Sequence, residues 1–244
     1  MCAFTEAYLF EISHIRYYTL IRLRKELCWM AIAGTSELRN IKVHHLMCLE
    51  LQKFIDRISQ ILPAIESSRP RCSLGMQALC SLQVALDKAK LLIQHCSESS
   101  KLYLAITADR IVLRCEKIRN ALELCLSQLQ NMAPSSLAAK IAGVVHDLKS
   151  LEFSVEYAED EAGKLILKLL QKDSPTSDST KCAELEALQN VAFMLKITSH
   201  SALVMEKRSI KLLVEKLHDT DQLKKILKYL LYLLRKYGEF IRQL

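Results

Sequence analysis

The amino-acid sequence predicts an all-α protein: an antiparallel helical bundle with a four-helix core, followed by a smaller C-terminal helical hairpin or three-helix unit. Glycine and proline, which interrupt helices and form turns, number only 5 and 4 among 244 residues. Apolar residues recur at alternating steps of three and four in several separate segments, a spacing that places them on one face of a helix. Because 50% of the residues are hydrophobic, a sizeable core is available.

The first 40 residues are predicted to form an atypical N-terminal helical extension. One helix over 4–33 would end at Gly34, although its apolar residues are distributed around its whole circumference. Ser36 is a suitable N-cap for the following helix, which we expect Pro63 to interrupt. The core-facing residues of this second helix are Met47, Leu51, Phe54, Ile58 and Ile61.

Three further helices complete the predicted four-helix core, which we place at residues 41–171. The middle one is expected to run as a single long helix from the end of segment 97–100. Short connections between such helices favour antiparallel neighbours. The predicted core-facing residues are Leu79, Leu82, Leu86, Ala89, Ile93 and Cys96 in the first helix, Ile111, Cys115, Ile118, Leu122, Cys125 and Leu129 in the second, and Leu137, Ile141, Val144, Leu148, Leu151 and Val155 in the third.

Residues 156–161 contain four acids and open a short helix that continues through Leu165 and Leu169. Acidic side chains are favourable at a helix N-terminus because they interact with the positive end of the helix dipole. Asp160 and Lys164 lie four residues apart, so they can form a pair on the helix surface. We therefore assign these acids a structural role.

A polar segment over 172–180 is predicted to be a flexible linker. Within it, Ser174 precedes Pro175, and this dipeptide makes Ser174 a candidate phosphorylation site, with a passive linker as the alternative. The C-terminal helices at 181–244 are expected to pack on the bundle.

The nine cysteines do not indicate a disulfide framework. Their number is odd, no C-x-x-C pair occurs, and several occupy apolar helix positions. A reducing compartment is therefore expected: the cytoplasm, with the nucleus or the periphery of a membrane as alternatives. Glu6 and Glu11 interrupt any signal-peptide pattern, and the apolar stretch 226–234 is far shorter than the roughly 18 residues of a membrane span.

No catalytic, metal or cofactor site is predicted. The glycines are isolated, whereas a phosphate-binding loop needs them clustered. The nearest zinc candidate is His44 and His45 with Cys48, but it lacks a second ligand pair. We interpret it as a core cysteine beside exposed histidines. Nucleic-acid binding is not expected either, because the few aromatic residues are not interleaved with basic ones.

Positive charge is concentrated near the C-terminus. The chain carries a net charge of +7, and residues 205–244 contain ten Lys or Arg and five Asp or Glu, a difference of +5. If the last two helices pack side by side, their basic rows would merge into a partner-binding patch. The alternative is a solvated basic face. The candidate residues are Lys207, Arg208, Lys211, Lys224, Lys228 and Arg235.

Four sequence segments carry a resemblance to a known family: VHHLMCLEL (43–51), GMQALC (75–80), ALDKAKLLIQHCSESSKLYLAITADR (85–110) and ILKYLLYLLRKY (226–237). They resemble the N-terminal helical domain of plant U-box ubiquitin ligases, in the subgroup that combines this domain with a U-box and armadillo repeats. The resemblance covers about residues 41–242.

This resemblance implies a non-catalytic interaction module that binds a regulatory or substrate protein, such as a kinase. The U-box would be expected after Leu244, so the chain looks truncated before it. Ubiquitin-protein transferase activity is thus implied for the family but not for these residues. The alternatives are a fragment of a full-length ubiquitin ligase and a basic helical bundle that binds a membrane surface. No cofactor, small-molecule substrate or nucleic-acid partner is expected.

Overall fold

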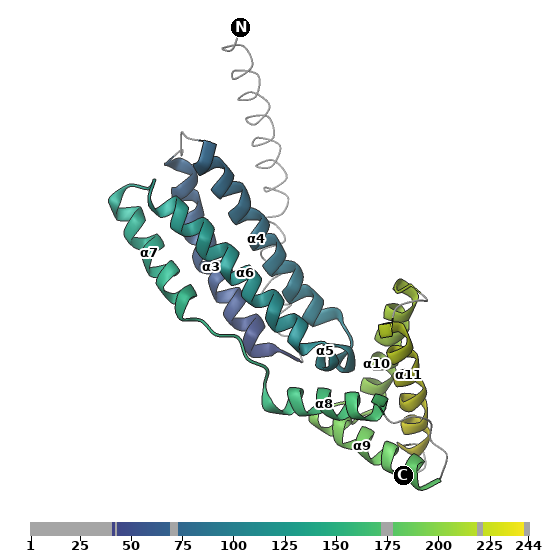
Figure 1. Ribbon diagram of the computed structural model, residues 1–244. Helices are drawn as coiled ribbons and strands as arrows, with labels where there is room; N and C mark the ends of the chain where they lie inside the picture. The colour runs from purple at the N-terminus through teal and green to yellow at the C-terminus, as the bar shows by residue number, and fades with distance from the viewer. Residues whose placement is uncertain (1–40, 42, 69–72, 172–177, 219–221, 242–244) are drawn as a thin grey trace. The chain divides into compact units, whose positions relative to one another are not determined.

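The computed structural model describes residues 41, 43–68, 73–171, 178–218 and 222–241 (Figure 1). Every regular element within these ranges is an α-helix, so the all-α prediction is confirmed. The predicted extension at 1–40 and Ser174 lie outside the described residues. The helices are α3 (His45–Ser67), α4 (Ser73–Glu98), α5 (Lys101–Ile106), α6 (Ala108–Gln130), α7 (Ser135–Ser150), α8 (Tyr157–Gln171), α9 (Asp178–Met194), α10 (His200–Lys216) and α11 (Gln222–Ile241).

Helices α3, α4, α6 and α7 form the bundle (Figure 1). Helix α4 packs against α3 and α6, and α7 packs against α3 and α6 on the other side. The predicted apolar stripes of α4 and α6 are buried along their whole length, as is the α7 stripe from Leu137 to Leu148. Burial of these side chains supplies the main favourable free energy of folding.

Pro63 does not interrupt α3, contrary to the prediction. The helix continues to Ser67, whose hydroxyl donates a hydrogen bond to the carbonyl oxygen of Pro63 at 2.8 Å. Proline removes only one backbone donor, and the side chains of Leu62 and Ile65 on either side of it are buried. The apolar contacts of this last turn therefore maintain the helix.

The single long helix predicted after segment 97–100 is two helices, α5 and α6, separated at Thr107. The Thr107 hydroxyl donates to the carbonyl oxygen of Tyr103 at 2.7 Å, and its backbone is not helical (φ −111°, ψ 15°). A side chain that competes for backbone carbonyls in this way can end a helix. The break makes α5 a separate short helix at one end of the bundle.

Helix α7 also ends earlier than predicted, at Ser150. Leu151 is extended (φ −79°, ψ 125°), and its carbonyl oxygen accepts a hydrogen bond from Arg119 of α6 at 2.5 Å. Leu151 and Val155 are therefore not part of the α7 stripe. They belong to the connection that leads to α8, in which Phe153 is the buried apolar side chain.

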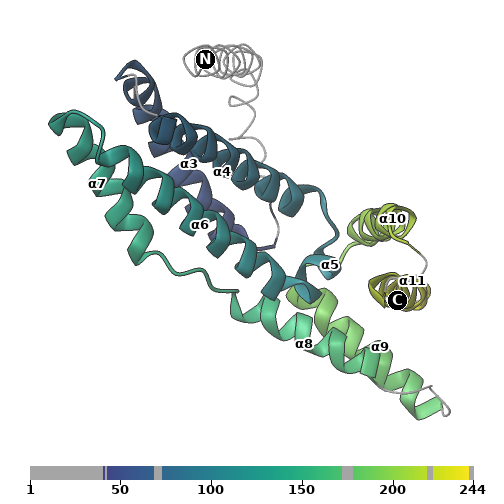
Figure 2. The same cartoon turned by 45° about the horizontal axis from the view of Figure 1, so that its top comes forward.

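The last four helices form two pairs, α8 with α9 and α10 with α11 (Figure 2). Helix α8 also packs on α5, and α11 packs on α9. Helix α9 begins at Asp178, so residues 178–180 of the predicted linker lie in a helix. No described helix has both the length and the apolar character needed to cross a lipid bilayer.

Candidate protein-interaction surface

Helix α10 is joined to α5 by one buried carboxylate. Glu206 accepts hydrogen bonds from the Ser100 hydroxyl at 2.5 Å, the Lys101 amide at 3.1 Å and the Leu102 amide at 2.9 Å. The first amides of a helix have no partner within the helix and carry partial positive charge. Glu206 satisfies two of them, and this contact fixes α10 to the end of the bundle.

The neighbouring Lys101 side chain joins α5 to the end of α9. Its ammonium group donates to the carbonyl oxygens of Leu195 and, at 2.9 Å, Lys196. Lys196 has a left-handed backbone (φ 53°), and the Ile197 amide donates to the Ala192 carbonyl oxygen at 2.7 Å. These bonds supply donors to carbonyl groups at the end of a helix, which otherwise have no hydrogen-bond partner within the helix.

The start of α3 is joined to α8 by His44 and Glu159. The His44 amide donates to Glu159 Oε1 at 2.8 Å, and His44 Nδ1 forms an ion pair with Glu159 Oε2 at 2.9 Å. On the other side of the ring, Nε2 donates to the Leu104 carbonyl oxygen at 3.1 Å. Because both ring nitrogens face oxygen acceptors, the arrangement favours the doubly protonated, charged imidazole.

The electrostatic environment of His44 agrees with a charged ring. Burial lowers the pKa of the imidazole, but the hydrogen bond and charge of Glu159, the hydrogen bond to the Leu104 carbonyl oxygen and the charge of Cys96 together raise it more, so the pKa lies above the ordinary value of 6.5. The expectation of two exposed histidines is thus wrong for His44, while His45 is exposed and Cys48 is a core residue. His44 has a left-handed backbone (φ 59°), which redirects the chain at the start of α3.

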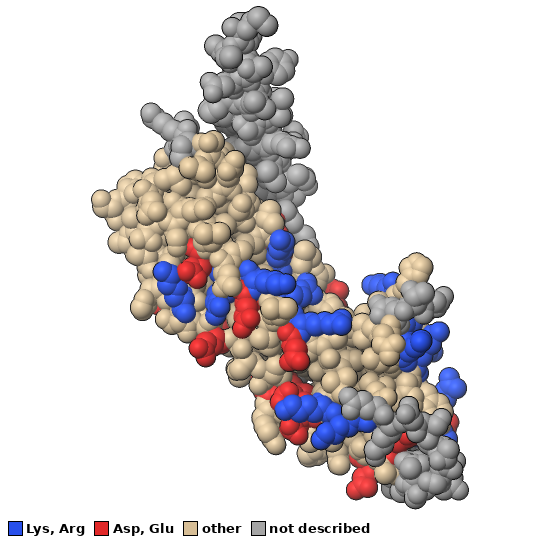
Figure 3. All heavy atoms as spheres, in the orientation of Figure 1, with Lys and Arg blue, Asp and Glu red and all other residues tan. Residues whose placement is uncertain are grey.

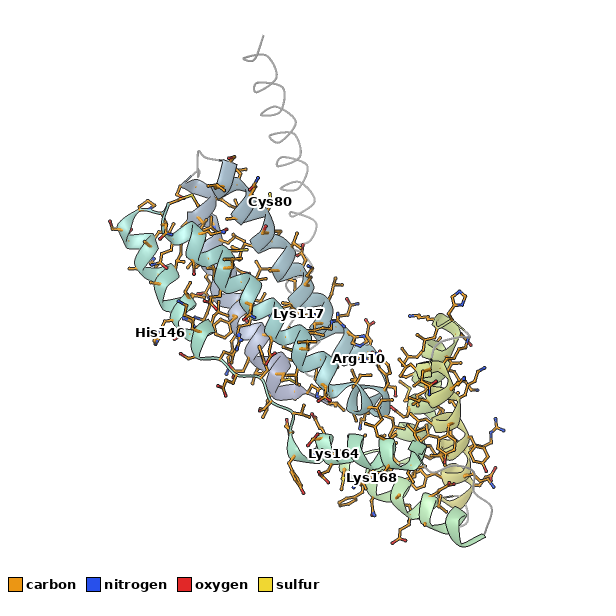
Figure 4. The ribbon with its side chains drawn as sticks, viewed as in Figure 1. Cys80, Arg110, Lys117, His146, Lys164 and Lys168 are labelled. Carbon is orange, nitrogen blue, oxygen red and sulfur yellow. The ribbon has the colours of Figure 1, made fainter. Side chains whose placement is uncertain are left out.

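Helix α8 approaches α5 closely at Gly163. A Cβ atom at this position would lie 2.5 Å from the Ala105 carbonyl oxygen, well inside the contact distance. At the exposed side of α8, Lys164 forms the predicted pair with Asp160 at 2.5 Å (Figure 4). The predicted structural role of the acidic segment is therefore confirmed for this pair.

The described cysteines are mostly core residues. Cys48, Cys96, Cys115 and Cys125 are buried and only Cys80 is exposed. Burial raises the pKa of the Cys115 thiol to about 12, so this thiol stays protonated at neutral pH. Within the described ranges no group of three or more His, Cys, Asp or Glu side chains is placed to hold a metal ion.

Two residues of the predicted basic patch lie at the contact between α10 and α11. A Cβ atom at Gly238 would lie 2.8 Å from Lys207 Nζ, so the Lys207 side chain crosses onto α11. Lys224 Nζ donates to the Leu217 carbonyl oxygen at 2.7 Å and thereby caps the end of α10. Both lysines are half-buried and contribute to the packing of the two helices.

The other four residues of the patch, Arg208, Lys211, Lys228 and Arg235, are exposed. None of them forms an ion pair with another described residue. Figure 3 shows basic side chains along the outer edge of α10 and α11. The structure thus divides the predicted set into two packing residues and four exposed cations.

Exposed apolar side chains lie on the same side of α10 as Arg208 and Lys211 and were not predicted. Val204, Met205 and Leu212 of α10 are 48%, 61% and 49% exposed. Met205 and Leu212 are seven residues apart, two helical turns, with Arg208 between them. Together, the exposed residues Val204, Met205, Arg208, Lys211, Leu212, Lys228 and Arg235 are here called the hairpin surface.

A second exposed region, formed by described residues of α4, α6 and α7 at one end of the bundle, has no charged side chains. Segments 73–86 and 124–139 contain no Asp, Glu, Lys or Arg, and Figure 3 shows this end as a continuous uncharged area. Leu74 and Leu124 are exposed there. Cys80 projects from the same end (Figure 4).

The chain is similar to several curated proteins of Arabidopsis thaliana. It is 44% identical over 177 residues to U-box domain-containing protein 5, an alignment that covers 72% of this chain and 24% of that protein. It is 39% and 40% identical over 203 residues to U-box domain-containing proteins 7 and 45, covering 82% of this chain and 26% of each relative.

No family model and no solved structure matches the chain. The chain spans about a quarter of the length of the relatives that it matches, at 24% to 26%. The resemblance inferred from the four sequence segments is confirmed by these alignments, and over 72% to 82% of its length the chain is homologous to plant U-box domain-containing proteins.

Proposed function

We propose that the chain is a non-catalytic protein-interaction module of a plant U-box ubiquitin ligase and that it binds a regulatory or substrate protein. The observation that supports this most directly is the hairpin surface, where the exposed cations Arg208 and Lys211 lie beside exposed apolar side chains of α10. Met and Arg are enriched at protein–protein interfaces. A mixed surface of this kind is therefore suited to a protein partner.

The attachment of α10 and α9 to α5 supports the same proposal. Glu206 and Lys101 hold these helices in fixed positions through hydrogen bonds to α5. A surface that is already ordered loses less conformational entropy when a partner binds. A kinase is the partner class that the family resemblance suggests.

Two alternatives are weighed against this module. In the first, the chain is the partner-binding part of a full-length ubiquitin-protein ligase that acts in protein ubiquitination. In the second, it binds a membrane surface. The second has less support, because Leu227, Leu230 and Leu234 of α11, which an inserted helix would present to lipid, are buried.

The proposal is tested by affinity purification of the intact chain from plant extract, with identification of bound proteins by mass spectrometry. We expect a reproducible set of proteins that remains bound at physiological salt. The matched control is a Leu82→Asp variant, which places a charge in the bundle core and should unfold it. If the unfolded variant and the intact chain retain the same proteins, the module has no specific partner and the proposal is wrong.

A further inference from the structure

Three cysteine thiols from three neighbouring helices lie together near one end of the bundle. Cys48 is in the first turn of α3, Cys96 is in the last turn of α4, and Cys115 is near the start of α6. Helix α4 packs against both α3 and α6 (Figure 1), and the three side chains are buried. The thiols of Cys48 and Cys96 are hydrogen-bonded to each other, whereas Cys115 interacts with this pair through charge. Cys48 and Cys96 are therefore two sulfur atoms in contact across a helix interface.

The contact gives the two thiols different acidities. The Cys48 thiol donates to the Cys96 sulfur, and the pKa of Cys96 lies below its usual range mainly because of this bond. The charges of His44 and Arg114 lower this pKa further, whereas burial and the charge of Glu159 raise it by less. The same hydrogen bond, together with burial, raises the pKa of Cys48. Because the thiolate is the nucleophilic form of cysteine, Cys96 is the attacking sulfur of the pair.

A fixed positive charge lies beside these thiols. The Cys48 amide donates to the His44 carbonyl oxygen at 3.1 Å, so His44 precedes Cys48 by one helical turn. Both nitrogens of the charged His44 ring already face oxygen atoms of Glu159 and Leu104. The ring therefore stabilises a thiolate on Cys96 by its charge and does not take the proton of that thiol.

An oxidant reaches buried thiols only when the surrounding structure opens. Cys48 and Cys96 are each 2% exposed, but both lie in terminal turns of their helices. Terminal turns open at a lower free energy than helix centres, because fewer of their backbone groups are paired within the helix. Local opening at this end of the bundle therefore gives a small oxidant access to both sulfur atoms without global unfolding.

We propose that Cys48 and Cys96 form a reversible disulfide when the chain reacts with a hydroperoxide, and that this bond is a redox switch within the bundle. The disulfide joins α3 covalently to α4 beside the contact of His44 with α5 and α8. A crosslink between residues 48 and 96 restricts the unfolded chain, so the oxidised protein is the more stable form. This switch is separate from the proposed interaction function and does not involve the hairpin surface.

The reaction has two steps, and the hydroperoxide supplies all the oxidising equivalents. The Cys96 thiolate attacks the hydroperoxide: a sulfur–oxygen bond forms, the oxygen–oxygen bond breaks, and the leaving oxyanion takes a proton from water. The Cys48 sulfur then attacks the sulfenic acid on Cys96. The sulfur–sulfur bond forms, the sulfur–oxygen bond breaks, and the hydroxyl group leaves as water with the Cys48 proton. Two thiols are oxidised to one disulfide, and the hydroperoxide is reduced to an alcohol, or water, and a second molecule of water.

Peptide mapping identifies the disulfide. The test uses the full chain with Cys2, Cys28, Cys72, Cys80 and Cys182 replaced by serine, so that only Cys48, Cys96, Cys115 and Cys125 remain. The reduced protein is treated with hydrogen peroxide in native buffer and digested with trypsin without a reductant. We expect a disulfide between peptides 43–53 and 91–101, which dithiothreitol separates. Cys115 lies in a different peptide, 115–117, so a bond from Cys96 to Cys115 is distinguishable.

Three results of this map would overturn the proposal: no disulfide, a disulfide that involves peptide 115–117 instead, or a disulfide that forms only when urea unfolds the chain. Each would show that the native bundle does not hold Cys48 and Cys96 in a reactive arrangement. Because the map uses both cysteines unsubstituted, it decides the proposal even if a variant at either position fails to fold.

Thermal unfolding tests whether the disulfide acts as a switch. We expect peroxide to raise the unfolding midpoint by at least about 5 °C and dithiothreitol to restore the original value. Cys48→Ala in the same serine background is the control, and its midpoint should not rise with peroxide. A midpoint that is unchanged or lower after the disulfide has formed would mean that the bond strains the bundle, and the switch would be rejected.

Dimedone, which reacts with sulfenic acids, identifies the attacking sulfur. In Cys48→Ala we expect peroxide and dimedone to give an adduct on Cys96, because no second thiol is in contact to resolve the sulfenic acid. In Cys96→Ala we expect no adduct on Cys48, whose thiol stays protonated. Circular dichroism checks that both variants keep their helices. An adduct on Cys48 and none on Cys96 would contradict the assignment of Cys96 as the nucleophile.

Discussion

The carboxylate of Glu159 contacts both the backbone and the ring of His44, 2.8 Å from the amide nitrogen and 2.9 Å from Nδ1. These residues are separated by 115 positions in the sequence and connect the start of α3 to α8. The Leu104 carbonyl oxygen on the opposite side of the ring adds α5 to the same contact. Three elements therefore depend on one buried ion pair.

Glu159→Gln is expected to destabilise the protein by about 3 kcal/mol, because it leaves a buried charged ring without its counter-ion. The free energy of unfolding is measured by urea denaturation. Glu161→Gln is the matched control: Glu161 lies two residues along α8 and forms an ion pair with the exposed Lys164, so its substitution should cost less than about 1 kcal/mol. Equal effects of the two substitutions would contradict a special role for Glu159.

Stability should fall as the pH rises above about 6.5. Folding raises the pKa of His44, so its contribution to stability is fully present below the pKa of the unfolded state and is lost as the pH rises through the folded-state pKa. Urea midpoints between pH 6 and 9 measure this loss. His44→Gln should flatten the dependence in this range, and an unchanged pH profile in that variant would assign the effect to another group.

Glu206→Gln is expected to loosen α10 and α11 from the bundle. The amide group of glutamine offers only one accepting oxygen, so it cannot accept from Ser100, Lys101 and Leu102 as the carboxylate does. An unsatisfied buried donor costs about 1–3 kcal/mol.

Hydrogen exchange measures this effect by segment. In Glu206→Gln we expect faster exchange in α10 and α11, with little change in the buried amides of α4 and α6. Glu215→Gln, at an exposed position of the same helix, is the control and should leave exchange unchanged. Uniformly faster exchange across all helices would mean that Glu206 contributes to global stability rather than to this attachment.

The helices were predictable from the sequence because the relevant information is local. The apolar residues of α4 and α6 recur at helical spacing, so the buried face of each helix can be identified without knowing which helix packs against it. Helix ends were less predictable. The free-energy cost of Pro63 within α3 is smaller than the stabilisation from the buried residues around it. The break at Thr107 depends on a hydroxyl group, and because every threonine has one, the sequence does not mark this position.

The polar contacts could not be predicted because their partners are distant in sequence. Glu206 and Ser100 are 106 positions apart, and a glutamate within a helix looks like any solvated one. The basic patch was predicted from spacing alone, which does not specify the side of α10 that packs on α11. For this reason Lys207 was not recognised as a packing residue, and Met205 was not recognised as part of the exposed face.

Gly163→Ala is expected to destabilise the contact between α5 and α8. The added Cβ would lie 2.5 Å from the Ala105 carbonyl oxygen and 3.1 Å from the Ala105 carbonyl carbon, both backbone atoms that cannot rotate away. The two helices must separate to accept the methyl group, and overpacking of this kind typically costs about 1–3 kcal/mol. This loss should exceed the gain of up to about 1 kcal/mol that alanine brings to a helix in place of glycine.

Gly143→Ala is expected to have the opposite effect on stability. Gly143 lies within α7, and a Cβ there would meet no atom within 4 Å, so only the higher helix propensity of alanine remains. We expect this variant to be more stable by roughly 0.5–1 kcal/mol. Thermal and urea unfolding of the two variants should therefore shift in opposite directions from the wild-type values. A stabilising Gly163→Ala substitution would show that α8 does not require the close approach to Ala105, because the backbone could then accept a side chain at no net cost.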